Sequence, residues 1–303
     1  MRIKDFYKRC DKFIEEWLDG ANYSADPFLA HCRKGSGLRK KEYTRLLPEL
    51  FWGNPNRCLV VIINLNPGYG NDDKQYIGRK TLLRNGQLAS GYSTFARTNP
   101  CLVNASFHPA ATAWWSQKLK WIHKVFDCFD DRRLPFMLEL CPWHSKKWAE
   151  VKINVEDNNQ LDYIRNYVIA PAAYASKYAK EPIIISIGKA GEIYKKLGFC
   201  LLKTWGPNQH DDFPQWPENK KNDDAKVYFD YYACLEKNIH ILNIWMEGSN
   251  HTPSDRFFKI EQGIIKCIKN NMGKPLWLRI IQCIMSKIKI IVHSIQERCQ
   301  QSK

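Results

Sequence analysis

Apolar residues at the N-terminal end of the sequence recur at helical spacing. The series consists of Phe6, Cys10, Phe13, Ile14, Trp17 and Leu18. Residues three and four positions apart share one face of an α-helix, and Gly20 follows where a C-terminal cap would stand. The pattern predicts that the first element is an amphipathic helix.

Four apolar runs of seven or eight residues come later and are rich in β-branched residues, which is typical of buried strands. They span residues 58–65, 135–141, 182–188 and 239–245. Helical patterns lie between or after these runs: Trp115, Leu119, Ile122 and Phe126, then Leu161, Ile164, Val168 and Ala172, then 255–268. Strands that alternate with helices predict an α/β fold with a mainly parallel, four-stranded central sheet.

Two segments lie outside this alternation. The connection from Thr204 to Lys226 is long, polar and rich in Pro and Asn, which indicates either a functional surface loop or partial disorder. The segment from Pro275 to Lys303 carries isoleucines at helical spacing with interspersed Lys and Arg, which predicts a basic amphipathic helix. We therefore expect an α/β domain over 1–270 and a separate helix over 271–303. That helix packs on the domain or on a second copy, as in a homodimer; the alternative is a helix on a membrane surface.

The charge of the chain indicates the kind of partner, and its cysteine content indicates the cellular compartment. Lys and Arg number 46 against 31 Asp and Glu, so the net charge of +15 favours a polyanion, either nucleic acid or an anionic membrane surface. No run of about 18 apolar residues is present, which argues against a spanning helix. The 11 cysteines form no C-x-x-C pair, and the first ten residues carry charges where a signal peptide needs an apolar run. These features predict a cytoplasmic protein without a zinc site.

Polar or Gly/Pro-rich turns follow all four predicted strands. They are 64–70, 141–145 with Glu139 just before it, 188–191 and 248–254. Ligands of open parallel sheets bind outside the carboxyl ends of the strands, so these turns are the candidate site.

The same turns resemble the motifs of the uracil-DNA glycosylase superfamily. Asn66-Pro67-Gly68 closes a buried strand as in the N-P-G branch of that superfamily, PIIISIGKAG resembles its third core strand, and His251 in NHTPS resembles its second motif. The resemblance covers roughly residues 46–255. It departs from the family at Thr252, since the second motif usually reads His-Pro-Ser. The resemblance implies a three-layer α/β/α fold, DNA as the partner, and no metal or small-molecule cofactor, because the iron–sulfur branches need paired cysteines that this sequence lacks.

The resemblance also implies roles for individual residues. Cleavage of an N-glycosidic bond passes through an oxocarbenium-like sugar, so Asn66 would position the attacking water and His251 would donate a hydrogen bond to the departing base. The expected base-binding residues are Asn64, Pro67, Gly68, Tyr69, Glu139 and His144. The expected DNA-binding residues are Arg79, Lys80, Lys146, Lys147, Lys189, Ser254 and Arg256. Candidate residues for stacking on a flipped base are Phe95, Phe107 and Trp114.

The expected target is a 5-substituted or glucosylated cytosine. Gly68 stands where the uracil-specific branch has a tyrosine that closes the pocket against C5, and a carboxylate at Glu139 would accept a hydrogen bond from cytosine N4. The resemblance extends to bacterial members that excise hypermodified cytosines from phage DNA in defence. Three alternatives stay open: a uracil or mismatched-thymine repair glycosylase, a non-catalytic nucleic-acid-binding module with the same fold, and a nucleotide-binding enzyme. The last is weakened by the lack of a G-x-x-x-x-G-K-[ST] loop.

Overall fold

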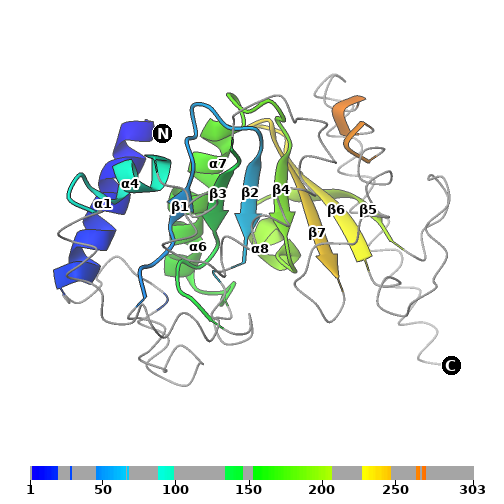
Figure 1. Ribbon diagram of the computed structural model, residues 1–303. Helices are drawn as coiled ribbons and strands as arrows, with labels where there is room; N and C mark the ends of the chain where they lie inside the picture. Colours follow the sequence, from blue (N-terminus) through cyan, green and yellow to red (C-terminus); the bar gives the residue numbers. More distant parts are fainter. Residues whose placement is uncertain are drawn as a thin grey trace, which may run out of the picture. The chain divides into compact units, whose positions relative to one another are not determined.

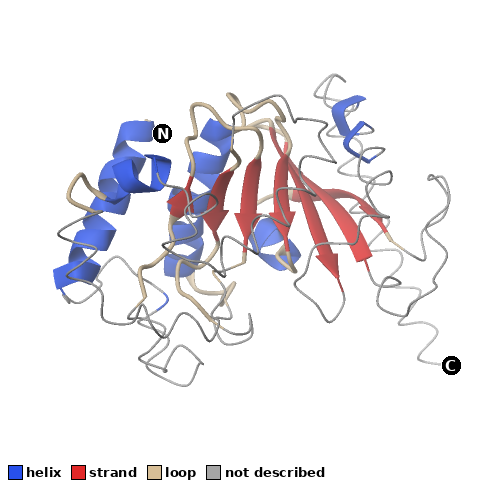
Figure 2. Ribbon diagram, viewed as in Figure 1, coloured by secondary structure: helices blue, strands red, loops and turns tan. Residues whose placement is uncertain are grey.

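The computed structural model of the chain is an α/β structure, shown by chain position in Figure 1 and by element type in Figure 2. It divides into two compact units, Met1–Ile187 and Gly188–Lys303. The residues that the structure describes are 2–19, 28, 46–65, 67, 88–98, 134–145, 153–206, 227–246, 264–266 and 268–270.

The strands of the first unit are β1 (Phe51–Trp52), β2 (Val61–Asn64), β3 (Phe136–Glu139) and β4 (Ile184–Ile187). Strand β2 pairs in parallel with both β3 and β4, while the short β1 pairs antiparallel with β3. Every residue of these four strands is buried, as expected for a sheet covered on both faces. Three of the apolar runs are therefore confirmed as strands.

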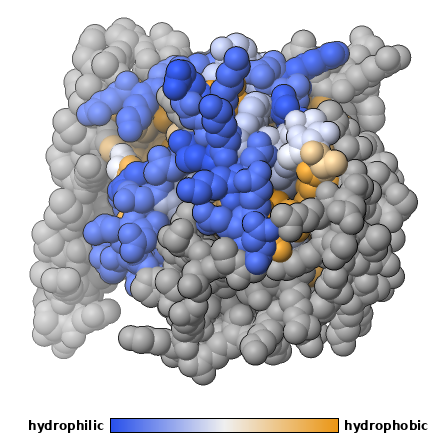
Figure 3. Space-filling view, turned by 90° about the vertical axis from the view of Figure 1, so that its left-hand side faces the viewer, coloured by the Kyte–Doolittle hydropathy of each residue, from blue (hydrophilic) through white to orange (hydrophobic). Residues whose placement is uncertain are grey.

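Helix α1 (Ile3–Asp19) is the amphipathic helix that the apolar spacing predicts. It buries Phe6, Cys10, Phe13, Ile14 and Trp17, whereas Leu18 is only half-buried. The helix contacts α4 (Tyr92–Thr98), which in turn contacts β1 (Figure 1). The outward face of this part of the molecule is mostly hydrophilic (Figure 3), because the unburied positions of α1 are largely Lys, Arg, Asp and Glu.

A second helical stretch packs on β2 through its last part and contains one wide turn. It consists of α6 (Asn158–Tyr163), the π-helical turn η6 (Ile164–Ile169) and α7 (Ala170–Ala175). In a π-helical turn, the N–H of each residue bonds to the carbonyl five residues earlier, but Pro171 has no N–H for the carbonyl of Asn166. The guanidinium of Arg9 donates to that carbonyl instead, with 3.2 Å between Nη2 and the carbonyl oxygen. The predicted helix through Leu161 and Ala172 is thus confirmed, with a π turn tied to α1.

The three described strands of the second unit pair antiparallel with one another. After α8 (Gly191–Lys196) come β5 (Cys200–Trp205), β6 (Val227–Cys234) and β7 (Ile239–Met246), in which β6 pairs antiparallel with both β5 and β7. A tight turn ending at Asn238, whose φ is +50°, joins β6 to β7. Strand β7 contains the fourth predicted strand, 239–245.

The expected mainly parallel, four-stranded sheet is wrong in strand number and direction. The described residues contain seven strands, of which β2 pairs in parallel with β3 and β4, whereas β1 pairs antiparallel with β3 and β6 pairs antiparallel with β5 and β7. Strands joined by a short turn pair antiparallel, so the turn before β7 fixes its direction relative to β6. Thr204 and Trp205, assigned to a loop from the sequence, belong to β5.

Several predicted elements lie outside the described residues. They are the helix through Trp115 and Phe126 and the C-terminal helix over 275–303, so the predicted boundary after residue 270 between the domain and this helix stays a prediction. Of the helix predicted over 255–268, residues 264–266 and 268 are helical, as are 269–270. None of the helices in the described ranges combines the length and apolar character that crossing a membrane requires.

Candidate functional site

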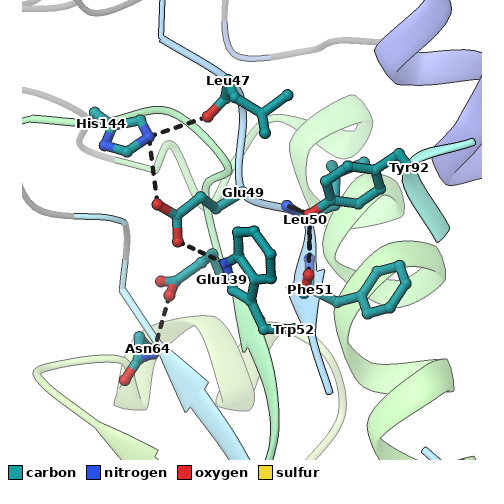
Figure 4. A network of polar contacts seen from close by, with 9 residues as sticks. All are labelled: Leu47, Glu49, Leu50, Phe51, Trp52, Asn64, Tyr92, Glu139 and His144. Atoms are coloured by element: carbon teal, nitrogen blue, oxygen red, sulfur yellow. Dashed lines mark hydrogen bonds and ion pairs between the residues drawn. The ribbon is translucent and has the colours of Figure 1, made fainter. Parts of the chain in front are cut away.

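Two predicted base-binding side chains meet at the carboxyl ends of β2 and β3. The parallel register places Asn64 opposite Glu139, and the Asn64 Nδ2 donates a hydrogen bond of 2.9 Å to Glu139 Oε1 (Figure 4). Both residues are buried, with 6% and 4% of their surfaces exposed. Adjacent parallel strands end at the same edge of a sheet, which is why residues 75 positions apart in sequence form this pair.

Each member of the pair keeps one buried polar atom without a hydrogen-bond partner among the described residues. These atoms are Asn64 Oδ1 and Glu139 Oε2. Buried polar atoms are nearly always hydrogen-bonded, and leaving one unpaired costs about 1–3 kcal/mol. The pair therefore has two buried polar atoms, one on each residue, whose hydrogen-bonding capacity is unused. A further buried asparagine with an unpaired amide, Asn243 of β7, lies in the second unit.

Glu49, in the segment before β1, belongs to the same group of polar side chains (Figure 4). Its Oε2 accepts a 2.8 Å hydrogen bond from the Trp52 indole Nε1, and its Oε1 lies 3.5 Å from His144 Nε2. The same His144 nitrogen lies 3.1 Å from the carbonyl oxygen of Leu47. The carboxyl group of Glu49 is therefore hydrogen-bonded to an indole and lies close to an imidazole.

Backbone hydrogen bonds fix the segments that carry these side chains. Beyond the strand ends, the amide of Ser145 donates to the carbonyl of Pro67 at 3.1 Å, and the amide of Glu49 donates to the carbonyl of Pro142 at 2.9 Å. On the other side of β1, the Tyr92 hydroxyl accepts hydrogen bonds from the amides of Leu50 and Phe51 and donates to the carbonyl of Phe51. Hydrogen bonds between backbone groups therefore hold in place the segments that carry the side chains of the site.

The surroundings of Glu139 favour its neutral form. Burial raises the pKa of this carboxyl group well above its ordinary value, the charge of Glu49 raises the pKa further, and the hydrogen bond from Asn64 acts in the opposite direction. A protonated Glu139 has an O–H donor, whereas Asn64 Oδ1 can only accept. The pair then has one donor and one acceptor.

The described residues contain five of the predicted site residues. Asn64, Glu139 and His144 belong to the group just described, and the carbonyl of Pro67 accepts from Ser145. Lys189 lies in the second unit, where it is exposed and its Nζ stands 5.4 Å from the ring centroid of Trp245. The other ten lie outside the described residues: Asn66, Gly68, Tyr69, Arg79, Lys80, Lys146, Lys147, His251, Ser254 and Arg256.

Of the three candidate stacking residues, the structure describes Phe95. Its side chain is buried, and its ring packs edge-on against Trp52 at a centroid distance of 5.8 Å, so it forms part of the core. Phe107 and Trp114 lie outside the described residues. In the part of the chain that the structure describes, no cluster of three or more His, Cys, Asp or Glu side chains is arranged to hold a metal ion.

The sequence interpretation did not select Glu49 and Trp52. Both lie in the apolar stretch LLPELFW, 46–52, in which every residue is buried. A glutamate inside such a stretch is a signal in itself, because acidic residues are almost never fully buried unless they are paired. Its partner His144 is 95 positions away in sequence, and nothing local indicates that contact.

No protein-family model, curated protein or solved structure matches this chain. The resemblance to the uracil-DNA glycosylases therefore stays a prediction that depends on the motifs quoted above.

Proposed function

We propose that the protein is a DNA glycosylase, which turns a modified base out of the duplex and hydrolyses its N-glycosidic bond to leave an abasic site. The observation that carries the proposal is the buried pair of Asn64 and Glu139, each with an unpaired polar atom, at the carboxyl ends of adjacent parallel strands. Enzymes that act on a base read its edge through such hydrogen bonds after flipping it out of the stack.

The catalytic roles fall to residues beyond the strand ends. Asn66 follows β2 by two positions and would hold the attacking water, while His251 would stabilise the negative charge on the departing base. The net charge of +15 supports a DNA partner, because phosphate contacts supply most of the sequence-independent affinity. The basic residues predicted around the site, such as Arg79, Lys146 and Arg256, would make these contacts.

The proposed target is a cytosine with a bulky substituent at C5, as in hypermodified phage DNA, and the biological role would be defence against phage. Gly68 supports this choice, because the resemblance implies that a glycine here would leave open the side of the pocket that a tyrosine closes in uracil-specific enzymes. The proposed compartment is the cytoplasm. The described cysteines, Cys10, Cys58, Cys141, Cys200 and Cys234, form no disulfide, which fits a reducing environment.

Incubation with defined DNA duplexes tests the proposal. The duplexes contain uracil, mismatched thymine, 5-hydroxymethylcytosine or its glucosylated form, and mass spectrometry detects the released base. We expect fastest release of a modified cytosine and loss of release in the Asn66→Ala variant. Asn56→Ala is the matched control, because Asn56 is exposed in the turn before β2 and should leave release unchanged. Release of uracil or thymine instead would make the protein a repair glycosylase, and DNA binding without release would overturn the enzymatic proposal.

A further inference from the structure

We propose that Glu139 contacts the substrate as a hydrogen-bond donor, in its neutral carboxylic acid form, and that Glu49 is the positioning residue that keeps it neutral. The inference deepens the proposed function and rests on it where it concerns the base. It changes the chemical role of Glu139, which as a carboxylate would accept a hydrogen bond.

The first argument is the set of groups around Glu139. Asn64 on β2 donates to Oε1, and no Lys or Arg forms an ion pair with Glu139 within the described residues. Among the described residues, the ionisable groups of the neighbouring segments are Glu49 before β1, Cys141 and His144 after β3, and the hydroxyl of Tyr92 on α4. That hydroxyl is already bonded to the backbone of residues 50–51. A buried carboxylate with one neutral donor and no counter-ion is strongly disfavoured relative to the acid.

The second argument is that Glu49 is fixed in place. Trp52 binds one of its oxygens at 2.8 Å, His144 lies near the other at 3.5 Å, and its own amide is bonded to the carbonyl of Pro142. A second negative charge on Glu139 would therefore repel a carboxyl group that its own contacts keep nearby. This repulsion and the burial of Glu139 both raise its pKa.

The protonated form determines which edge of a substrate fits. Glu139 Oε2–H is a donor, and Asn64 Oδ1, on the side chain bonded to Glu139, is an acceptor, so the complementary ligand has one acceptor and one donor. The N3 atom and the N4 amino group of cytosine form such a pair. In this arrangement Asn64 accepts a hydrogen bond from N4 and Glu139 donates one to N3. Neither hydrogen bond involves the C5 substituent.

Infrared spectroscopy tests the protonation state without any DNA. The difference spectrum between the wild-type protein and Glu139→Gln at neutral pH should contain the carbonyl band of one protonated carboxylic acid. The Glu49→Gln variant should shift the titration of that band to lower pH. Glu15→Gln, at an exposed position of α1, is the control and should leave the titration of the band unchanged. If Glu49→Gln does not fold, Glu49→Met removes the charge with a side chain of similar length.

Base release on the best DNA substrate gives a second readout. Release by the wild type should fall as the pH rises and Glu139 ionises, and in Glu49→Gln this fall should begin at lower pH. In the Glu139→Gln variant, the fall in base release at high pH should disappear, because the glutamine amide donates a hydrogen bond at every pH. Adding Glu49→Gln to this variant should not change the pH profile further. Glu139→Ala should lose about ten- to a hundredfold in release, the cost of unpaired buried partners.

The outcomes separate the inference from the proposed function. No carboxylic acid band at neutral pH, or a Glu139→Gln variant that is inactive where the wild type is active, overturns the inference. A band that titrates as expected, combined with no base release from any DNA, supports the neutral Glu139 and its control by Glu49 while overturning the glycosylase proposal.

Discussion

Replacement of Glu139 by glutamine should change how the stability of the fold depends on pH. Burial, and then the charge of Glu49, raise the pKa of Glu139 in the folded protein, whereas an unfolded chain has a glutamate pKa of about 4.3. Between these two pKa values the folded state holds a proton that the unfolded state has released. The wild-type protein therefore loses stability as the pH rises, by about 1.4 kcal/mol for each pH unit, until the pH reaches the folded-state pKa. Below the unfolded-state pKa this loss is absent.

Glutamine cannot ionise, so the Glu139→Gln variant lacks this loss. The free energy of unfolding, measured in urea at a series of pH values from about 4 upward, should show a growing advantage of the variant over the wild type. Ionisation of other groups contributes equally to both proteins and largely cancels in the difference. The value near pH 4 serves as an internal control, since Glu139 is then mostly protonated in both states. A difference that stays constant with pH, or that increasingly favours the wild type, would refute the reasoning.

Three further substitutions test the supports of the first unit. Tyr92→Phe leaves two buried backbone amides without their acceptor and should lower the free energy of unfolding by about 2–4 kcal/mol, while Tyr178→Phe, at a residue 50% exposed, should change it by less than about 0.5 kcal/mol. Arg9→Ala removes the hydrogen bond to the Asn166 carbonyl in the π turn and should lower the melting temperature by an amount equivalent to about 1 kcal/mol. An unchanged melting temperature would show that water replaces the guanidinium. Gly53→Ala brings a Cβ into collision with a backbone carbonyl at a φ of +90°, so it should destabilise more in urea than Gly198→Ala, which has a φ of +89° and open space.

The sequence predicts elements well where one local pattern decides the structure. The 3.6-residue spacing of Phe6, Cys10 and Phe13 predicts α1, and the apolar runs predict β2, β3, β4 and β7. The direction of a strand depends on the chain between strands. The segment VYFDYYAC, which becomes β6, is aromatic and is followed by a short polar turn, which is a hairpin signal. This hairpin makes β6 and β7 antiparallel, and the four apolar runs that predict a mainly parallel sheet do not include it.

The candidate site was predictable in part for the same reason. A polar residue at the carboxyl end of a buried strand is visible in the sequence, which is how Asn64 and Glu139 were selected. Their hydrogen bond depends on the parallel register of β2 and β3, and the position of Glu49 depends on His144, far away in sequence. The protonation state of Glu139 follows from these long-range contacts, so the sequence alone favoured a carboxylate where the structure favours the acid.

A comparison of the two buried carboxyl groups with raised pKa values indicates which of them is available to a ligand. Asp230 in β6 is 8% exposed and Glu139 is 4% exposed, and burial is the main cause of the raised pKa in both. Both oxygens of Asp230 are occupied, since the Thr204 hydroxyl and the Trp245 indole each donate to one of them at 2.7 Å. That arrangement joins three strands, and it gives each oxygen of Asp230 a partner within the fold. Glu139 has one oxygen bonded to Asn64 and one without a partner, so its desolvation is only partly compensated within the described fold. Burial and a raised pKa are therefore shared by a structural carboxyl group and a candidate functional one, and the unpaired oxygen is the feature that separates them.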